Sequence, residues 1–474
     1  MQLQKNHNKH LLATDQEAIV ALCTPRGSGA LALIRLSGVN AFEVANSCAR
    51  LSSNLSLLQA PSHTIHHGYV IDPADESTVD EVVFLLMRGP KTFTGQDTVE
   101  ITCHNNHFII ERIIELTIQQ GARAARGGEF TKRAFLNGKV DLLQAESINE
   151  LIHAQTEYAL RKSMATLHGS LSQSLQQLEA QLTNLLGYVE ASFEFLDEEQ
   201  RDLNFDQAII QRTQTIFDFI VQLRKHFSSQ KQIKEGVRVA LLGMVNVGKS
   251  TLFNALARQE RAIVTDIAGT TRDSIETGLY KNGNFWLLID TAGIRQTVDV
   301  VEKMGIERSF AQAAAADVIL VVVDATIPLT TEHAAHYALF INDYRDKVLV
   351  VINKIDAASD VALPPELLQG VPVISVSAKL GRGIADLEAT IEHKIQKLFA
   401  QLNAPFLINR RQFKLLTEIQ SKLEIIANSY SDGIHYELIA YQLKDLLESV
   451  SELTGRNVTE QVLDTVFNEF CVGK

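Results

Sequence analysis

The residues best suited to chemistry form a glycine-containing loop, Gly243-Met-Val-Asn-Val-Gly248-Lys249-Ser250. The apolar run VRVALLG leads into it and STLFNALARQ follows, so a strand is expected to enter the loop and a helix to leave it. Glycines let backbone N–H groups turn inward around phosphates, Lys249 adds a positive charge, and the Ser250 hydroxyl can bind Mg²⁺. The pattern predicts a nucleotide phosphate site, and its alternative is a plain glycine turn between strand and helix.

Two further motifs indicate which base the nucleotide carries. Asp356, in Asn353-Lys354-Ile355-Asp356 after the run VLVVI, can accept hydrogen bonds from the N1–H and 2-amino groups of guanine. Adenine lacks this donor pair and would leave a buried carboxylate unpaired, which is costly. Ser377-Ala378-Lys379, after VPVISV, is expected to contact the guanine carbonyl through its backbone. A polar loop at a strand end is common, but the motifs together favour GTP over ATP.

Two polar segments have the character of GTPase switch loops, which order and disorder with the γ-phosphate. In AIVTDIAGTTRD (262–273), Thr271 is the natural hydroxyl ligand for Mg²⁺, and the turn Asp290–Gly293 would sense the same phosphate. Ras-like GTPases continue with a Gln that orients the attacking water. Here Ile294 stands in its place, so the chain either does not hydrolyse nucleotide or uses another group. The residues predicted to bind GTP are Asn246, Val247, Gly248, Lys249, Ser250, Thr251, Thr265, Asp266, Ile267, Ala268, Gly269, Thr270, Thr271, Asp290, Thr291, Ala292, Gly293, Asn353, Lys354, Asp356, Ser377, Ala378 and Lys379.

Length and composition indicate the kind of chain that must position these residues. The 474 residues correspond to about three domains. Hydrophobic residues make up 46% and charged residues 21%, as in globular chains with sizeable cores. No apolar signal region or run of about 18 apolar residues occurs, so a cytoplasmic protein without a membrane span is predicted. The net charge of −12 argues against a nucleic-acid coat protein but allows a local basic patch.

Hydrophobic periodicity divides the chain into a fold class with three kinds of region. Residues 1–125 show short strand-like runs and a predicted helix at 107–120, which indicates an α+β domain. Residues 126–230 and 391–474 repeat apolar residues every three and four positions, as in helical bundles. Residues 235–390 alternate strands and helices, which predicts a mostly parallel sheet covered on both faces. We therefore predict a Ras-like P-loop α/β G domain inserted into one discontinuous α-helical bundle domain.

Six stretches go beyond a generic GTPase. They are GEFTKRAFLNGKVDLLQAE (128–146), GMVNVGKS, AIVTDIAGTTRD, DTAGIR, VEKMGIER and the terminal FCVGK. Together they resemble the bacterial tRNA modification GTPase family MnmE, also called TrmE, from about residue 17 to residue 474. The resemblance implies an N-terminal domain that binds tetrahydrofolate and forms a homodimer. It also implies a heterotetramer or larger assembly with an FAD-dependent MnmG-type partner, which adds a carboxymethylaminomethyl or aminomethyl group to carbon 5 of the wobble uridine of certain tRNAs.

The resemblance also implies a one-carbon donor and the residues that hold it. The donor would be 5-formyl- or methylene-tetrahydrofolate, with glycine or ammonium as the nitrogen source and with FAD and NADH on the partner only. Arg35, Glu100, Lys139 and Lys474 match folate-binding positions. Arg and Lys suit the glutamate tail, and a carboxylate suits the amino-imine edge of the pterin. Cys471 matches a cysteine of suspected catalytic role. The alternatives are surface charges at Arg35 and Lys139 and a small buried thiol at Cys471.

The resemblance implies that a monovalent cation compensates for the absence of the catalytic Gln. K⁺ between the β- and γ-phosphates would replace an arginine finger, and its site would form when two G domains meet across their switch loops. Glu302 matches a Glu that orients the attacking water through a second water. The alternative is a solvated Glu at a helix start. The K⁺ ligands implied by the resemblance are Asn246, Thr265, Ile267 and Thr270.

Three short segments depart from the family pattern. His104-Asn105-Asn106 stands where His-Gly-Gly is usual, and Asn tolerates positive φ better than most residues. Met244-Val245 replaces Arg-Pro in the phosphate loop, with Asn246 retained. Asp299-Val300-Val301-Glu302 replaces DEVE and keeps its final Glu.

Two basic clusters could contact tRNA phosphates, with binding that weakens as salt rises. A solvated helix face is an equally good interpretation of both. Two other functions also stay open: a regulatory GTP-binding switch of the ribosome-assembly type, which would not need the folate positions, and a scaffold that does not hydrolyse GTP. The first cluster, opposed by the single acid Glu129, is Arg123, Arg126, Lys132, Arg133 and Lys139, and the second is Arg410, Arg411 and Lys414.

Overall fold

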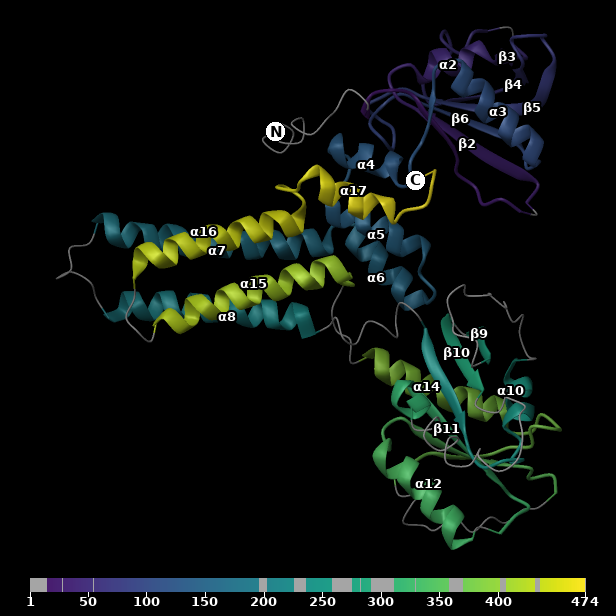
Figure 1. Cartoon of the computed structure of the whole chain (residues 1–474), viewed down its shortest axis with the longest axis vertical. Helices are drawn as coiled ribbons and strands as arrows, with labels where there is room; N and C mark the ends of the chain where they lie inside the picture. The colour runs from purple at the N-terminus through teal and green to yellow at the C-terminus, as the bar shows by residue number, and fades with distance from the viewer. Residues whose placement is uncertain are drawn as a thin grey trace. The chain divides into compact units, whose positions relative to one another are not determined.

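The computed structural model describes 12 segments of the chain, which fall into two compact units that we treat separately (Figure 1). One unit comprises 1–149, 165–220 and 414–474, and the other comprises 150–164 and 221–413. The predicted limits of the domains stay a prediction. The described residues are 15–27, 29–53, 55–195, 203–225, 236–257, 275–281, 283–290, 311–328, 330–357, 370–400, 406–430 and 435–473.

The first unit begins with a twisted sheet in the strand order β3-β4-β5-β6-β2-β1-β7. Its neighbouring strands are antiparallel, except that β7 runs parallel to β1. Every second side chain of β2, β5 and β6 enters one core with the helices α2 and α3, as the two-residue period of a strand requires. The strands are β1 (Ile19–Leu22), β2 (Leu31–Ser37), β3 (Ala49–Leu51), β4 (Thr64–Ile71), β5 (Thr78–Met87), β6 (Thr98–His104) and β7 (Arg123–Ala124), and the helices are α2 (Ala41–Ser47) and α3 (His107–Gln119).

The helix predicted at 107–120 is α3, and the segment His104-Asn105-Asn106 connects the end of β6 to it. Asn106 has φ −112°, and its side chain accepts a hydrogen bond from the backbone N–H of Phe108 at 2.9 Å. Within the described ranges, positive φ at non-glycine residues is confined to His63, Glu76, Asn246 and Lys354. Asn106 therefore serves here as a helix N-cap, and neither Asn105 nor Asn106 adopts the positive φ that Asn tolerates.

Helices from both sides of the inserted block pair with one another, as the predicted discontinuous bundle requires. In Figure 1, α16 lies along α7, and two ion pairs join them: Lys444–Glu190 at 2.8 Å and Arg456–Glu179 at 2.5 Å. Among the described helices, none is long and apolar enough to cross a membrane. The helices outside the inserted block are α4 (Glu129–Leu136), α5 (Leu142–Ile152), α6 (Glu157–Leu167), α7 (Ser170–Phe195), α8 (Leu203–Lys225), α15 (Arg410–Ser429), α16 (Tyr436–Thr454) and α17 (Glu460–Asn468), and most of α6 belongs to the second unit.

The second unit contains a six-stranded sheet in the order β13-β12-β11-β8-β10-β9, parallel except for β9. Alternate residues of β8 face opposite cores: Val239 packs with α10 and α14, and Ala240 packs with α12. This is the predicted mostly parallel sheet with helices on both faces. The elements are β8 (Val237–Leu242), α10 (Lys249–Ala257), β9 (Ile275–Lys281), β10 (Asn284–Asp290), β11 (Val318–Asp324), α12 (Thr331–Asp343), β12 (Val348–Asn353), β13 (Val373–Ser375) and α14 (Ile384–Ala400).

Candidate active site

The predicted nucleotide motifs meet at one edge of the parallel sheet. The phosphate loop follows the end of β8, and β11 and β12 end at Asp324 and Asn353, which are paired in register. Ser377 follows β13 on the far side of β12. Carboxyl ends of parallel strands share an edge, and such edges bind ligands in open α/β sheets. The fold thus brings together loops that lie more than 100 residues apart in the sequence.

The phosphate loop is a backbone cradle that leaves no room for side chains at two glycines. A Cβ on Gly243 would lie 2.4 Å from the carbonyl oxygen of Val322, and a Cβ on Gly248 would lie 2.4 Å from Nδ2 of Asn353. The Lys249 ammonium donates to the carbonyls of Gly243 and Met244, both at 2.8 Å. A cradle of this shape, with a cation across it, fits a nucleotide phosphate.

Asn353 ties the phosphate loop to the loop predicted to read guanine. Its Nδ2 donates to the carbonyl of Val247 at 2.9 Å, and its Oδ1 accepts from the N–H of Ala378 at 3.1 Å. The Ser377 hydroxyl donates to Asp356 at 2.6 Å and lowers the pKa of that carboxyl. Asp356 is therefore a carboxylate at neutral pH, as a partner for the two guanine donors must be.

Two residues of this edge were missed by the sequence reasoning. Asp324 is buried, and it accepts a hydrogen bond from the Lys354 ammonium at 2.5 Å. Tyr337 on α12 donates to the carbonyl of Val322 at 3.2 Å and accepts from the N–H of Met244 at 3.4 Å. An acid ending an all-apolar strand could have revealed Asp324. No pattern in the sequence distinguishes Tyr337 from an ordinary core residue.

The N-terminal sheet holds a second polar site on the face away from α2 and α3. Arg35 on β2 and Glu100 on β6 are opposite in register, and Nε of Arg35 donates to Glu100 at 2.8 Å. Their side chains are 18% and 13% exposed. The guanidinium lies 5.7 Å from the ring centre of Phe93 and 5.6 Å from that of Phe130. The two charges touch, so Arg35 holds the Glu100 carboxylate in place, and the folate-binding role of both residues stays a prediction.

Lys139 and the C-terminal tail border the same sheet. The exposed Lys139 donates from Nζ to the carbonyl of Pro90 at 2.8 Å, in the β5–β6 loop that also carries Phe93. The Cys23 thiol donates to the carbonyl of Gly473 at 3.1 Å, and a Cβ on Gly473 would lie 2.4 Å from the carbonyl oxygen of Leu22. The tail therefore packs closely against the end of β1.

The cysteines differ in accessibility. Burial raises the pKa of Cys48 and of Cys103 to about 11, so both thiols are protonated and unreactive at neutral pH. Cys471 is exposed, so its interpretation as a small buried thiol was wrong. Its catalytic role stays a prediction.

Comparison with known proteins identifies the family. Residues 142–471 match the family described as MnmE helical domain, and residues 18–139 match GTP-binding protein TrmE N-terminus. The "tRNA modification GTPase MnmE" of Geobacillus thermodenitrificans (strain NG80-2) is 37% identical over 97% of this chain and 100% of the relative. The Aquifex aeolicus (strain VF5) protein of the same name is 39% identical over 97% of this chain and 100% of the relative. The chain belongs to the MnmE family.

Membership in the MnmE family confirms the predicted resemblance, the multidomain fold class and an enzyme of the GTP-hydrolase class. Solved structures also align with about a third of the chain. The G domain of the Thermotoga maritima FeoB iron transporter is 30% identical and covers 34% of this chain and 98% of its own, with a TM-score of 0.27. A single-residue variant of Aquifex aeolicus Era, bound to GDP and AlF₄⁻, is 32% identical and covers 33% of this chain and 56% of its own, with a TM-score of 0.27.

Several predicted site residues lie outside the described part of this MnmE-family chain. Both predicted switch loops, most of the K⁺ ligands and the C-terminal Lys belong to this group. Asp290 is described only as the last backbone position of β10. Of the predicted metal ligands, Ser250 lies in the first turn of α10 and Asn246 in the phosphate loop, both exposed. The undescribed residues are Thr265, Asp266, Ile267, Ala268, Gly269, Thr270, Thr271, Thr291, Ala292, Gly293, Ile294, Glu302 and Lys474.

The first basic cluster is largely occupied by contacts within the MnmE-family chain. Arg133 is fully buried and donates to the carbonyl of Glu17 at 2.7 Å and to the Glu129 carboxylate at 3.1 Å. Arg123 donates to the same carboxylate at 2.7 Å, and Lys132 pairs with Asp464 at 2.7 Å. Both interpretations of Arg133, as a phosphate contact and as a solvated charge, were therefore wrong, because folding encloses it.

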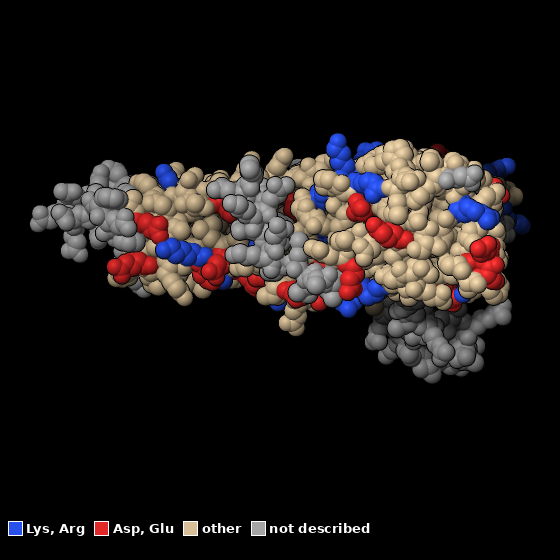
Figure 2. Space-filling model, turned by 90° about the horizontal axis from the view of Figure 1, so that it is seen from above, with Lys and Arg blue, Asp and Glu red and all other residues tan. Residues whose placement is uncertain are grey.

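The second basic cluster is more accessible. Arg410 and Lys414 are exposed at the start of α15, and Lys414 lies 3.8 Å from Glu418. Among the residues that Figure 2 colours, Lys and Arg are interspersed with Asp and Glu on the face shown. A tRNA surface stays a prediction for Arg410, Arg411 and Lys414, and for the exposed Arg126.

Proposed function

We propose that this chain is a K⁺-dependent GTPase that, with an FAD-dependent MnmG-type partner, adds a carboxymethylaminomethyl or aminomethyl group to carbon 5 of the wobble uridine of certain tRNAs. The observation that carries the proposal is the loop cluster at the edge of the G-domain sheet, within a chain that aligns with MnmE relatives over 97% of its length. We further propose a cytoplasmic protein that dimerises through its N-terminal domain and joins its partner in a heterotetramer or larger assembly.

The G domain would act mainly by holding the nucleotide in position. Gly243 and Gly248 let the loop backbone surround the phosphates. The Lys249 ammonium, which donates to two carbonyls of the loop, would donate to the phosphates instead when nucleotide binds. Asp356 would accept the two guanine donors. When bound, Mg²⁺ on Ser250 and Thr271 and K⁺ on Asn246, Thr265, Ile267 and Thr270 would supply positive charge to the phosphates.

The Arg35–Glu100 pair fits the pterin end of a tetrahydrofolate. A pterin edge presents donors and acceptors side by side. The Glu100 carboxylate, which accepts from Nε of Arg35 at 2.8 Å, would also accept from that edge, and other N–H groups of the Arg35 guanidinium would donate beside it. Phe93, which is 39% exposed, provides an accessible aromatic ring next to the pair. Lys139 lies at the same loop and carries a charge suited to the glutamate tail. Bound there, 5-formyl- or methylene-tetrahydrofolate would supply the one-carbon unit.

The K⁺ requirement can be tested by measuring GTP hydrolysis in KCl and in NaCl at equal ionic strength. We expect much faster hydrolysis in KCl. Asn246→Gly, which removes the side-chain amide but tolerates the φ of +65° at this position, should keep GTP binding and lose the KCl stimulation, by on the order of a hundredfold, because removing one preorganised electrostatic contact to a transition state costs about that much. Equal measurable rates in both salts would reject K⁺ catalysis, and no hydrolysis in either would favour the scaffold.

A further inference from the structure

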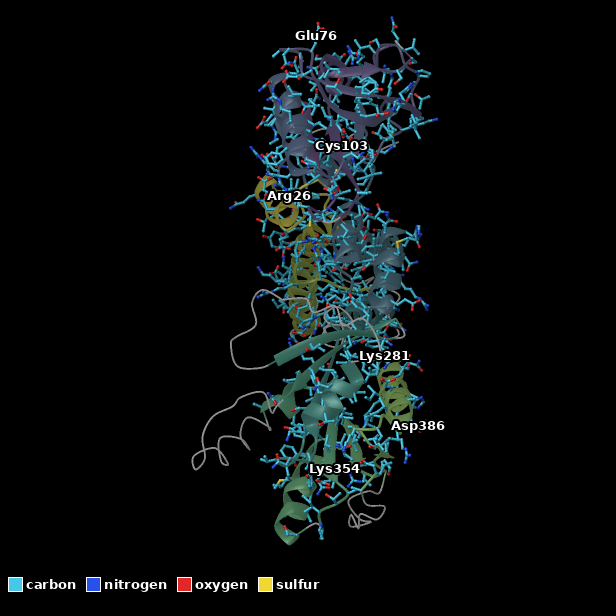
Figure 3. The ribbon with its side chains drawn as sticks, turned by 90° about the vertical axis from the view of Figure 1, so that its right-hand side faces the viewer. Arg26, Glu76, Cys103, Lys281, Lys354 and Asp386 are labelled. Carbon is cyan, nitrogen blue, oxygen red and sulfur yellow. The ribbon has the colours of Figure 1, made fainter. Side chains whose placement is uncertain are left out.

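A network of three residues connects the loop predicted to bind guanine, Asn353–Asp356, to the phosphate loop. The Lys354 ammonium lies 2.5 Å from Oδ2 of Asp324 and donates to the carbonyl of Asn246 at 2.8 Å (Lys354 is labelled in Figure 3). Asn246 has φ +65° and Lys354 has φ +68°. In the described part of the second unit, these are the only two non-glycine residues with positive φ. The Lys354 ammonium therefore links its own turn to the turn at Asn246, and both turns have a backbone conformation that is unfavourable for non-glycine residues.

The Asp324 carboxylate is held in a fixed orientation. Its side chain is 3% exposed, and Oδ1 accepts from the backbone N–H of Thr326 at 2.9 Å and from the Thr326 hydroxyl at 2.7 Å. Burial raises the pKa of Asp324, but the hydrogen bonds from Lys354 and Thr326 outweigh it and bring the pKa below its ordinary value. A charged oxygen, Oδ2, is thus directed at Lys354 at neutral pH.

This arrangement matters because left-handed backbone at a non-glycine residue persists only where the surroundings hold it. The carbonyl of Asn246 is held by the Lys354 ammonium, and that ammonium sits on a long side chain with many rotamers. Without the opposing carboxylate, Lys354 could turn toward solvent, since its side chain is already 37% exposed. The turn at Asn246 would then lose the contact that restrains it.

We propose that Asp324 is a positioning residue: it holds Lys354 against Asn246 and so fixes the phosphate-loop turn required for nucleotide binding and for K⁺. The K⁺ part rests on the proposed function, whereas the nucleotide part needs only a guanine-nucleotide site. A competing explanation is that Asp324 merely ties the ends of β11 and β12 together. That role would affect thermal stability but not the binding constants of the folded protein.

The test compares Asp324→Asn with the wild-type full-length chain. Asn keeps an oxygen for Thr326 but loses the charge that holds Lys354. Two quantities are measured: the dissociation constant of N-methylanthraniloyl-GDP, and the KCl concentration that gives half-maximal GTP hydrolysis. We expect the dissociation constant to rise roughly tenfold, as for loss of a hydrogen bond to a charged group, and the half-maximal KCl concentration to rise in parallel.

Asp317→Asn is the matched control. Asp317 precedes β11 at its opposite end, where its carboxylate accepts from the N–H of Arg238 at 2.9 Å. Both measured constants should stay at their wild-type values in this variant. Asp324→Glu, which retains the charge, should restore part of the nucleotide affinity.

Wild-type constants in Asp324→Asn would overturn the proposal, whether or not its melting temperature falls. If the wild-type protein shows no K⁺ dependence, the K⁺ part of the proposed function fails, while the GDP titration still decides the role of Asp324. If Asp324→Asn does not fold, Thr326→Val replaces it. That variant removes one hydrogen bond that orients the carboxylate, and a smaller shift of the dissociation constant in the same direction is expected. No shift in Thr326→Val would then count against the proposal.

Discussion

Replacing Gly248 with alanine should separate nucleotide binding from folding. The added Cβ would lie 2.4 Å from Nδ2 of Asn353, at a residue whose φ is +95°. Asn353 must therefore move, and it would lose its hydrogen bonds to Val247 and Ala378. Those two bonds join the phosphate loop to the guanine loop, so their loss should weaken the nucleotide site as a whole.

The size of the effect follows from these contacts. Positive φ at alanine costs about 1–2 kcal/mol, which acts in free and bound protein alike and lowers stability rather than affinity. Each lost hydrogen bond of Asn353 contributes about 1 kcal/mol net. If both are needed for the bound geometry, affinity falls by about 2 kcal/mol, or roughly thirtyfold.

The assay is a titration with N-methylanthraniloyl-GDP, with the melting temperature of each variant recorded alongside. Gly370→Ala is the matched control, because Gly370 has φ +79° but nothing within 4 Å of an added Cβ. It should lose stability and keep nucleotide affinity. Wild-type affinity in Gly248→Ala, or an equal loss of affinity in both variants, would refute the steric reasoning.

Three other outcomes are expected. Burial raises the pKa of Glu129, but hydrogen bonds from Arg123 and the Arg126 amide, together with the charge of Arg133, outweigh it and lower that pKa from 4.5 to about 2. The lowered pKa corresponds to roughly 3 kcal/mol of folding free energy at neutral pH. Since the pKa is lowered on folding, this stability is complete above about pH 4.5 and is lost as pH falls toward 2. Glu129→Gln should therefore flatten the fall of the urea midpoint between pH 5 and pH 3, and an unchanged slope would count against it. Arg35→Ala should weaken 5-formyltetrahydrofolate binding in calorimetry without changing GTP affinity; wild-type folate affinity would mean that the site lies elsewhere. Glu302→Ala should bind GTP normally and lose most turnover, and an unchanged kcat would remove this residue from the mechanism.

The motifs predicted to bind nucleotide lie together because each stands next to a strand of one parallel sheet. Asn353 ends one apolar run and the phosphate loop follows another, and parallel strands bring their carboxyl ends together. Asp324 was missed although it also ends such a run. The proposed role of Asp324 depends on Lys354. Lys354 reaches Asp324 only because β11, which ends at Asp324, lies next to β12, which ends just before Lys354.

Long-range pairing limits what charge patterns can show. Arg133 stands among basic residues on a short helix, a pattern typical of solvated charge, yet its partners include the carbonyl of Glu17 and the side chain of Gln96. Likewise, nothing in the sequence pairs Arg35 with Glu100, which are 65 residues apart, until the register of β2 and β6 is known. Such contacts follow from tertiary structure, which periodicity does not encode.

Coupling of GTP hydrolysis to tRNA modification is tested most directly by mass spectrometry of wobble nucleosides. Unmodified tRNA would be incubated with the chain, its FAD-dependent partner, NADH, methylene-tetrahydrofolate, glycine or ammonium, and GTP in KCl. We expect a carboxymethylaminomethyl or aminomethyl group on the wobble uridine, its loss when GTP is omitted, and a large decrease when Glu302→Ala is used. Unmodified uridine in the complete reaction, with GTP hydrolysis intact, would contradict the proposed function and favour a regulatory switch.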